Sequence, residues 1–258
     1  MTASALHGIA IAGLLGILTN CHPSTRSGRT PTWTNGLGMD MIRVETEDHA
    51  LWVARHETRV RDYRTFVRAT GRPWPRPAFR QGSDHPAVMV SWHDATAFCQ
   101  WLSEKEHHPY RLPTDAEWSS LTQNSPSSLP RFPWGGRQPA PPPRAGNYCD
   151  AAFGRRFGRD YDAAWIPQYD DGWAATAPVG RFIPLPNGLC DLAGNVWEWT
   201  DSWIDPSHPR ERSVRGGSWR TGNADRLQTA FRGPDPPDFR LDSVGFRIVS
   251  SRPPTLER

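Results

Sequence analysis

The first part of the chain combines two short apolar runs with a helical repeat. Residues 41–44 read Met-Ile-Arg-Val and residues 50–54 read Ala-Leu-Trp-Val-Ala, which are apolar runs of strand length. Between residues 59 and 67 the apolar positions recur at helical spacing, at Val60, Tyr63, Phe66 and Val67. The pattern therefore predicts two strands followed by a helix.

Capping residues indicate two further helices. Residues 86–90 form a short apolar run, predicted to be a strand, that leads into a helix over 92–105. Ser91 is the natural N-cap of this helix, and Asp94 supplies an acid at its third position. In the segment 111–118, Arg-Leu-Pro-Thr-Asp-Ala-Glu-Trp, a threonine and a glutamate have the spacing of a capping box and predict a helix that starts at Thr114.

The stretch from Asn124 to Pro186 has little periodicity. It is rich in Pro, Gly, Asp and aromatic residues and contains three consecutive prolines at 141–143. Such a stretch is either disordered or held by something other than regular backbone hydrogen bonding, and a bound cation would serve that purpose.

The N-terminus is typical of an exported bacterial protein. The apolar stretch from Gly8 to Leu18 is shorter than the about 20 residues that span a bilayer, and it fits the apolar region of a signal peptide. It ends at Leu-Thr-Asn-Cys, similar to a lipobox in which Cys21 would be acylated. Because Asn20 is large for its position and no Lys or Arg precedes it, an uncleaved anchor or a misplaced start codon is the alternative. The predicted organisation is a signal peptide over 1–21, a polar linker over 22–38, one domain over 39–252 and a tail over 253–258.

Composition narrows the class of protein. The 258 residues include 13 Trp, 26 Pro and 22 Gly, which favours a loop-rich globular domain with an aromatic core over a disordered chain. The net charge of +3 comes from 30 basic and 27 acidic residues that are dispersed along the chain. A nucleic-acid-binding protein would cluster its basic residues on one face, so we expect no nucleic acid partner.

Four segments resemble the formylglycine-generating enzyme family, also called sulfatase-modifying factors: 111–118, Gly-Asn-Val-Trp-Glu-Trp at 194–199, Arg-Gly-Gly-Ser-Trp at 215–219 and Gly-Phe-Arg at 245–247. The resemblance implies an α+β, loop-rich variant of the C-type lectin-like fold with little regular secondary structure. It also implies catalytic thiols that hold copper(I) shortly after the Gly-Gly-Ser turn. No cysteine follows Cys190, and residues 220–227 carry hydroxyl, amide and charged groups instead, so copper is not expected.

The resemblance also implies a structural calcium site at residues 191–198. Two carboxylates flank a glycine here, and calcium takes about six to eight oxygen ligands. Carried over from the family, the ligands are the side chains of Asp191 and Glu198 and the carbonyls of Gly194 and Val196. The alternative is a loop in which Glu198 pairs with an arginine and Asp191 caps a turn.

A second family calcium site resembles residues 147–148 combined with 171–173. Its implied ligands are the side chains of Asn147 and Asp171 and the carbonyls of Tyr148 and Trp173. The alternative is a salt-bridged surface loop built from Arg155, Arg156, Arg159, Asp160, Asp162 and Asp170.

The remaining cysteines and the histidines give weaker indications. Cys99 lies in an apolar helical pattern and is expected to be buried, whereas Cys149 and Cys190 could form a disulfide worth roughly 4 kcal/mol. The nine histidines show no spacing that predicts a three-histidine metal site, and His107-His108 is interpreted as a solvent-facing helix cap. A Ser/His/Asp triad stays open, although no Gly-x-Ser-x-Gly elbow occurs.

The cleft that the resemblance implies is a binding surface. Trp197, Ser218, Trp219 and Arg232 match pocket positions of the family, and Asn223 lies in the polar segment after the turn. Core packing is the alternative for Trp197, whereas Trp219 and Asn223 are expected to make exposed contacts. Aromatic walls with a few polar groups suit a peptide, sugar or small molecule.

Two functions follow from these patterns. We expect a lipoprotein of the periplasm or outer membrane, attached through its N-terminal anchor, that acts as a calcium-stabilised binding or accessory protein for a peptide, protein or small-molecule ligand. The alternative is a periplasmic oxidoreductase of the same family. It would generate formylglycine on sulfatases, or catalyse an oxidation or tautomerisation like that of the pyoverdine-maturation members.

Overall fold

The computed structural model of the chain describes residues 32–46, 49–122, 131–135, 140–158 and 165–253. The predicted signal peptide with Cys21 lies outside these ranges. Four helices occur within them: α1 (Val60–Thr70), α2 (Trp92–Glu106), α3 (Asp115–Leu121) and α4 (Ala151–Phe157). No helix in these ranges is long and apolar enough to cross a membrane.

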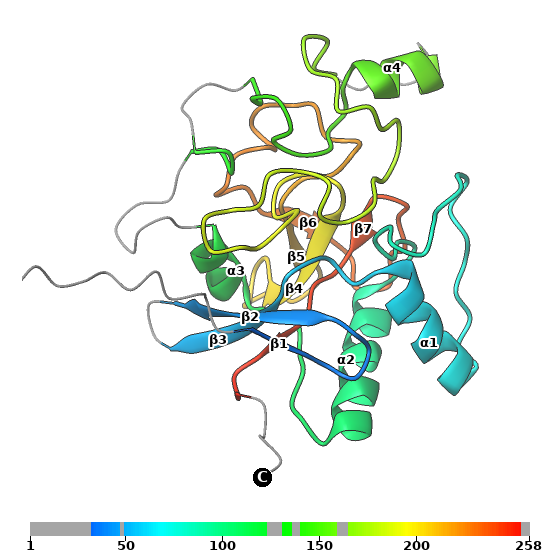
Figure 1. The fold of residues 1–258 in the computed structure, drawn as a ribbon, viewed down its shortest axis with the longest axis vertical. Coiled ribbons are helices and arrows are strands. Elements are labelled where there is room, and N and C mark those ends of the chain that lie inside the picture. Colours follow the sequence, from blue (N-terminus) through cyan, green and yellow to red (C-terminus); the bar gives the residue numbers. More distant parts are fainter. Residues whose placement is uncertain (1–31, 47–48, 123–130, 136–139, 159–164, 254–258) are drawn as a thin grey trace, which may run out of the picture.

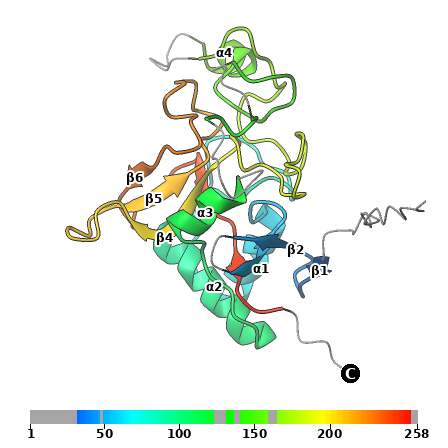
Figure 2. The same ribbon diagram turned by 90° about the vertical axis from the view of Figure 1, so that its left-hand side faces the viewer.

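Two four-stranded sheets lie at the centre of the described residues (Figure 1). The first has the order β1-β2-β3-β8, with β1 at Thr32–Thr34, β2 at Asp40–Glu45, β3 at Ala50–Ala54 and β8 at Val249–Ser250. The second has the order β6-β5-β4-β7, with β4 at Trp197–Trp203, β5 at Arg212–Arg215, β6 at Gly233–Asp235 and β7 at Val244–Gly245. Figures 1 and 2 show α2 below the sheets and long coil segments, with α4, above them.

The strands predicted at 41–44 and 50–54 are confirmed as β2 and β3, which pair antiparallel from Met41 opposite Ala54 to Glu45 opposite Ala50. Strand β1 was missed, because it lies within the segment predicted to be a polar linker. Its residues pair with β2, and the Trp33 ring packs 5.2 Å from that of His108. The folded region therefore begins earlier than residue 39.

Both predicted helix starts are confirmed. The Ser91 hydroxyl accepts a hydrogen bond from the Asp94 backbone N–H, and the Asp94 carboxylate accepts one from the Ser91 N–H, each at 3.1 Å. Thr114 and Glu117 form the same reciprocal pair at the start of α3. These capping boxes satisfy backbone donors that the first helical turn leaves without partners.

The strand predicted over 86–90 is wrong. Met89 has a positive φ of 58°, which interrupts an extended run, and its N–H donates to Leu241 instead of to a sheet neighbour. The apolar character of this segment has another cause, because Ala87, Val88 and Val90 are buried in the protein core.

An aromatic core joins α1 and α2 to the second sheet. Tyr63 and Phe66 of α1 pack against Phe98 of α2, and Phe98 lies 5.3 Å from Phe246 between ring centroids. Trp199 of β4 is fully buried in the same cluster, and its indole N–H donates to the Val90 carbonyl at 2.9 Å. Two small sheets, short helices and extensive coil make this an α+β, loop-rich architecture.

Candidate functional site

The loop over residues 191–198 lies on a set of buried charges. Glu198 is 1% exposed, and its carboxylate accepts hydrogen bonds from Trp118 Nε1 and from Arg247 Nη2, both at 2.7 Å. Asp191 accepts a hydrogen bond from the Gly180 N–H at 2.6 Å. Glu198 is thus paired with an arginine, and Asp191 is bound to a turn. These are the contacts expected from the alternative, a loop that is held without calcium.

These contacts leave the loop with more carboxyl groups than cationic partners. Glu57 is fully buried, and its carboxylate accepts hydrogen bonds from Asn195 Nδ2 at 2.6 Å and from the Val196 N–H at 3.1 Å. Burial, and then the carboxylates of Asp191 and Glu198, raise the pKa of Glu57 well above its usual range. One guanidinium, that of Arg247, faces these three carboxylates.

Asp191 also carries an oxygen without a partner. Its Oδ1 is buried and accepts no hydrogen bond from the described residues, and burial raises the pKa of Asp191 to about 6. A buried oxygen of this kind is costly unless a donor or a cation satisfies it. The loop therefore fits a cation, even though Glu198 already has an arginine partner.

The second predicted calcium loop has the same feature. Asn147 donates through Nδ2 to the Ala175 carbonyl at 2.8 Å, while its Oδ1 is buried with no hydrogen-bond partner among the described residues. Asp171 accepts hydrogen bonds from the N–H groups of Tyr148 at 2.9 Å and Trp173 at 2.7 Å. The structure thus brings together the side chains and backbone segments that the resemblance combined.

Asp171 lies beside a second carboxylate. Burial, and then the neighbouring Asp150, raise the pKa of Asp171 to about 8. One surface salt bridge of the alternative also forms, because Arg155 pairs with Asp170 at 2.7 Å, and it leaves the Asp171 carboxylate free of an arginine partner among the described residues. Other members of that alternative, Arg159, Asp160 and Asp162, lie outside the described residues.

The two loops are joined by direct contacts. Asn195 donates from its N–H to the Asn147 carbonyl at 2.8 Å and accepts from Asn147 Nδ2 at 3.1 Å. Gly194 has a φ of 79°, and a Cβ at this position would lie 2.2 Å from the Asn147 carbonyl oxygen. Only glycine fits this approach. No group of three His, Cys, Asp or Glu side chains in the described part of the chain could hold a metal, so a cation would also need backbone carbonyls.

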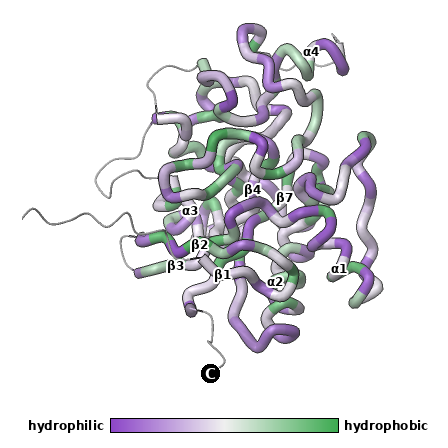
Figure 3. Tube along the Cα trace, in the orientation of Figure 1, coloured by the Kyte–Doolittle hydropathy of each residue, from purple (hydrophilic) through white to green (hydrophobic). Residues whose placement is uncertain are grey.

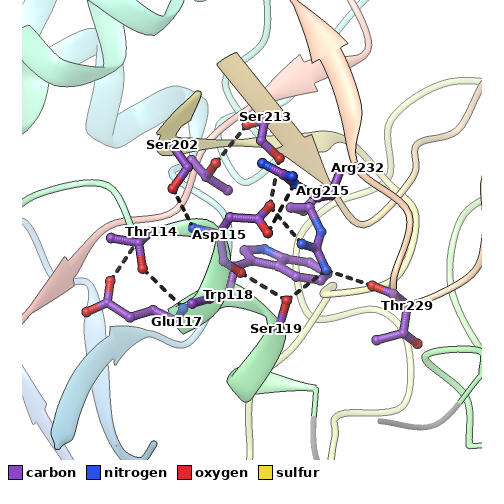
Figure 4. A network of polar contacts seen from close by, with 12 residues as sticks. Thr114, Asp115, Glu117, Trp118, Ser119, Ser202, Ser213, Arg215, Thr229 and Arg232 are labelled. Carbon is purple, nitrogen blue, oxygen red and sulfur yellow. Dashed lines mark hydrogen bonds and ion pairs between the residues drawn. The ribbon is translucent and has the colours of Figure 1, made fainter. Parts of the chain in front are cut away.

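The Gly-Gly-Ser turn is fixed by a buried arginine. Arg215 is 1% exposed and pairs with Asp115 at 2.7 Å, while also donating to the Thr229 carbonyl at 2.8 Å (Figure 4). Burial alone would raise the pKa of Asp115, but the adjacent Arg215 guanidinium outweighs burial and lowers it. Arg232, predicted to line the cleft, also pairs with Asp115 at 3.2 Å.

The five residues predicted to line one cleft are not brought together. Trp219 was expected to be exposed, but it is 2% exposed, because its ring packs among Phe79, Phe153 and Phe157 and its indole N–H donates to the Asp242 carbonyl. The other four line neither of the two cavities described below. Ser218 is fully buried, Trp197 is half-buried beside Phe231, and Asn223 and Arg232 are exposed.

A small pocket opens beside Trp219. Its volume is about 190 Å³, and its lining includes Trp219, Arg220, Asp242, Phe79 and Phe157. Arg220 donates to the Asp242 carboxylate at 2.8 Å across its rim. We call this the Trp219–Arg220 pocket. Sequence reasoning missed most of its members, and the one available signal was that Arg220 directly follows the turn.

Comparison with known proteins identifies the family. A family model described as the sulfatase-modifying factor enzyme 1-like domain matches residues 16–252. The chain belongs to this family. It is 35% identical over 188 residues to the inactive C-alpha-formylglycine-generating enzyme 2 of Mus musculus, covering 69% of this chain and 54% of that relative. It is 30% identical over 206 residues to the formylglycine-generating enzyme of Streptomyces coelicolor, covering 72% and 60%.

The chain spans about half the length of the curated mammalian relatives that it matches, such as 49% of the formylglycine-generating enzyme of Mus musculus.

Solved structures support the fold. PvdO of Pseudomonas aeruginosa matches with a TM-score of 0.67 at 19% identity over 88% of this chain and all of its own. Treponema denticola variable protein 1 matches with a TM-score of 0.59 at 20% identity over the same shares. The predicted fold class is therefore confirmed.

The cysteines of this family member lie apart. Cys99, Cys149 and Cys190 are free and buried, so the structure contradicts the predicted disulfide. Cys149 packs in an apolar cluster with Trp219, whereas the Cys190 thiol faces the Gly188 carbonyl at 3.9 Å. Burial raises the pKa of both thiols to about 11.

The segment after the turn has polar side chains in place of thiols. The Thr221 hydroxyl accepts a hydrogen bond from the Ser218 N–H at 3.1 Å and lies 3.2 Å from the Ser218 hydroxyl. Asn223 accepts a hydrogen bond from the Asp225 N–H at 2.8 Å. These side chains close the turn on itself, and none of them is a soft ligand.

Proposed function

We propose that this chain is a calcium-stabilised binding or accessory protein of the cell envelope that does not carry out the copper-dependent reaction of its family. The observation that carries the proposal is the absence of any cysteine after Cys190, which includes the segment after the Gly-Gly-Ser turn. Copper(I) prefers thiolate ligands, and the thiols of Cys149 and Cys190 are held protonated in separate buried environments. The 35% identity to a relative named as inactive supports this direction.

Calcium is proposed as a structural ion at two adjacent loops. Each loop has one buried side-chain oxygen without a hydrogen-bond donor, Asp191 Oδ1 in the first and Asn147 Oδ1 in the second. Carboxyl groups lie close together in both loops, Asp191 with Glu57 and Glu198 in the first and Asp171 with Asp150 in the second, and calcium would supply the compensating positive charge. Each loop would hold one ion through the ligands named for it from the sequence. In the first loop, Glu198 would be shared between the ion and Arg247. Ordered coil would then be stabilised where few regular backbone hydrogen bonds are available.

The binding role is supported by the Trp219–Arg220 pocket. With a volume of about 190 Å³, it is smaller than the roughly 300–1,000 Å³ of typical small-molecule sites, so it suits one side chain or end group of a larger ligand. Aromatic rings form one wall, and the Arg220–Asp242 pair provides a polar edge. No reaction is assigned to this pocket.

Export and lipid attachment are proposed from the N-terminal sequence. Residues 8–18 supply the apolar stretch, and Cys21 supplies the acylation site. Expression in a bacterium with labelled palmitate tests this proposal. The wild-type chain should carry the label and Cys21→Ser should not, whereas equal labelling of both would contradict it.

The lack of copper-dependent activity is tested by an aldehyde assay. Purified protein is loaded with copper(I) and incubated with a peptide that contains Cys-x-Pro-x-Arg, and the peptide is analysed by mass spectrometry. We expect no conversion of cysteine to formylglycine, while the Streptomyces coelicolor enzyme converts the same peptide in parallel. Turnover by this chain would contradict the proposal and favour the oxidoreductase alternative.

A further inference from the structure

A larger groove lies between α1 and the chain segment that follows it. Its volume is about 910 Å³, and it is bounded by one face of α1 and by residues 74–81. In Figure 1 the segment after α1 runs beside this helix at the right of the view. Figure 3 shows long hydrophilic stretches along it. We call this the α1 groove.

The two sides of the α1 groove carry positive charge without partners. Four exposed arginines line it: Arg64, Arg68, Arg76 and Arg80. None of the four forms an ion pair within the described residues, whereas Arg61 and Arg72, which lie just outside the groove, pair with Asp84 and Asp94. Four uncompensated guanidinium groups across one groove favour an anionic occupant, because their fields add in the space between them. Guanidinium groups also match carboxylates in a bidentate geometry.

The spacing of these charges indicates an extended anion. Arg64 and Arg68 lie one helical turn apart, about 6 Å along the face of α1. Arg76 and Arg80 are four residues apart in a segment without helix, which can extend over about 13 Å. A single phosphate would require these groups to converge on one point. A polypeptide in extended conformation instead presents a side chain on the same face about every 7 Å, which suits both sides of the groove.

The floor of the groove favours a polypeptide over a bare anion. Trp74 is half-buried there, and its orientation is fixed because its indole N–H donates to the Val88 carbonyl at 2.9 Å and its ring packs edge-on against Tyr63. Val67 and Phe79 add further apolar surface. Pro75 and Pro77 lack backbone N–H groups, so this side cannot pair as a regular strand and must bind mainly through side chains.

The groove also reaches the Trp219–Arg220 pocket. Ala78 and Phe79 line both cavities, so the two are neighbours across one short piece of chain. A ligand that lies along the groove can place its end in the pocket.

We propose that the α1 groove binds an extended acidic polypeptide segment, whose carboxylates pair with the arginines on both sides and whose end enters the Trp219–Arg220 pocket. The inference rests on the proposed function, since it names the ligand class for the binding role. The ligand contains aliphatic or aromatic side chains between its acidic residues, because the floor of the groove is apolar.

Fluorescence anisotropy with defined peptides tests this proposal. The probe is a fluorescein-labelled dodecapeptide of alternating Glu and Ala with one central Phe, and the matched peptide has Lys in place of each Glu. At low salt the acidic peptide should bind, and the double variants Arg64→Glu/Arg68→Glu and Arg76→Glu/Arg80→Glu should each weaken binding about tenfold. The matched control is Arg181→Glu/Arg210→Glu, which changes two exposed arginines outside the groove and should leave binding within about twofold.

Three results would overturn the proposal. The first is equal weakening by the groove variants and the control, which would indicate only a response to net charge. The second is binding of the Lys peptide as tightly as the Glu peptide. The third is tighter, groove-dependent binding to phosphatidylglycerol vesicles than to the acidic peptide, which would assign the groove to a membrane surface. Formylglycine formation in the aldehyde assay would contradict the proposed function instead, and it would leave these binding results unaffected.

Discussion

Replacement of Arg247 by methionine should destabilise the fold more than almost any other single change. Arg247 is fully buried, and its guanidinium binds the Glu198 carboxylate and the backbone carbonyls of Ala54, Arg55 and Cys190, at 2.7–2.8 Å for the closest contact to each. It therefore joins β3, β4 and the start of the loop over residues 191–198. Methionine fills similar space but offers no donor.

The magnitude follows from what the change leaves behind. Removal of one partner from a buried ion pair costs about 3–5 kcal/mol, because the other charge remains buried without compensation. Here the remaining charge is that of Glu198, which is 1% exposed and has Glu57 and Asp191 nearby. For a chain of this size each kcal/mol lowers Tm by about 2–4 °C, so we expect Tm to fall by about 6–20 °C.

Urea unfolding followed by tryptophan fluorescence measures this loss. The matched control is Arg61→Met, because Arg61 pairs with Asp84 at 2.7 Å on the surface, where both side chains are about half exposed, and its loss should cost less than about 1 kcal/mol. The double variant Arg247→Met/Glu198→Gln should lose less stability than the sum of the two single changes. A loss below about 1 kcal/mol for Arg247→Met, or one equal to that of the control, would show that the buried Glu198 carboxylate does not depend on Arg247.

Two further substitutions and one labelling experiment test separate parts of the structure. Asp191→Asn should lower Tm in millimolar calcium but not in chelator, whereas an equal shift in both would remove calcium from this loop. The Glu117 carboxylate is stabilised by Arg111 and by the Thr114 N–H; these contacts outweigh its burial and lower its pKa to about 2. Its contribution is fully present above the unfolded pKa of about 4.5 and is lost as pH falls towards 2. Glu117→Gln should therefore cost on the order of 1–3 kcal/mol in urea titrations at pH 7, about the same at pH 5 and clearly less at pH 3; an equal cost at pH 7 and pH 3 would contradict this. Cys149 and Cys190 should both react with iodoacetamide in denaturant without prior reduction, and protection of both until reduction would restore the disulfide.

Features fixed by neighbouring residues could be predicted from the sequence. The capping boxes at Ser91 and Thr114 need only a side chain and a backbone three residues away, so their helix starts were located correctly. Met89 shows the limit of this approach. An apolar run indicates burial, but the positive φ that prevents a strand is set by contacts with distant Leu241.

In the candidate sites too, features set by residues close in sequence could be predicted, whereas contacts between distant segments could not. The motif around Gly194 identified which residues meet at the two loops predicted to bind calcium, but the sequence does not indicate that Arg247 would be the partner of Glu198. Trp219 was predicted to be exposed because its neighbours in the chain are polar. Its actual surroundings, including Phe79 and Phe157, come from segments far away in sequence, and they bury it.

Metal content distinguishes a chain that binds calcium at the loops over residues 147–148, 171–173 and 191–198 from one that binds copper. The purified protein is loaded with copper(I) without oxygen, desalted and analysed by mass spectrometry for both metals. We predict calcium bound in stoichiometric amount, removed only by chelator with a fall in Tm, and copper far below one equivalent. One tightly held copper per chain, or full thermal stability without calcium, would contradict the account.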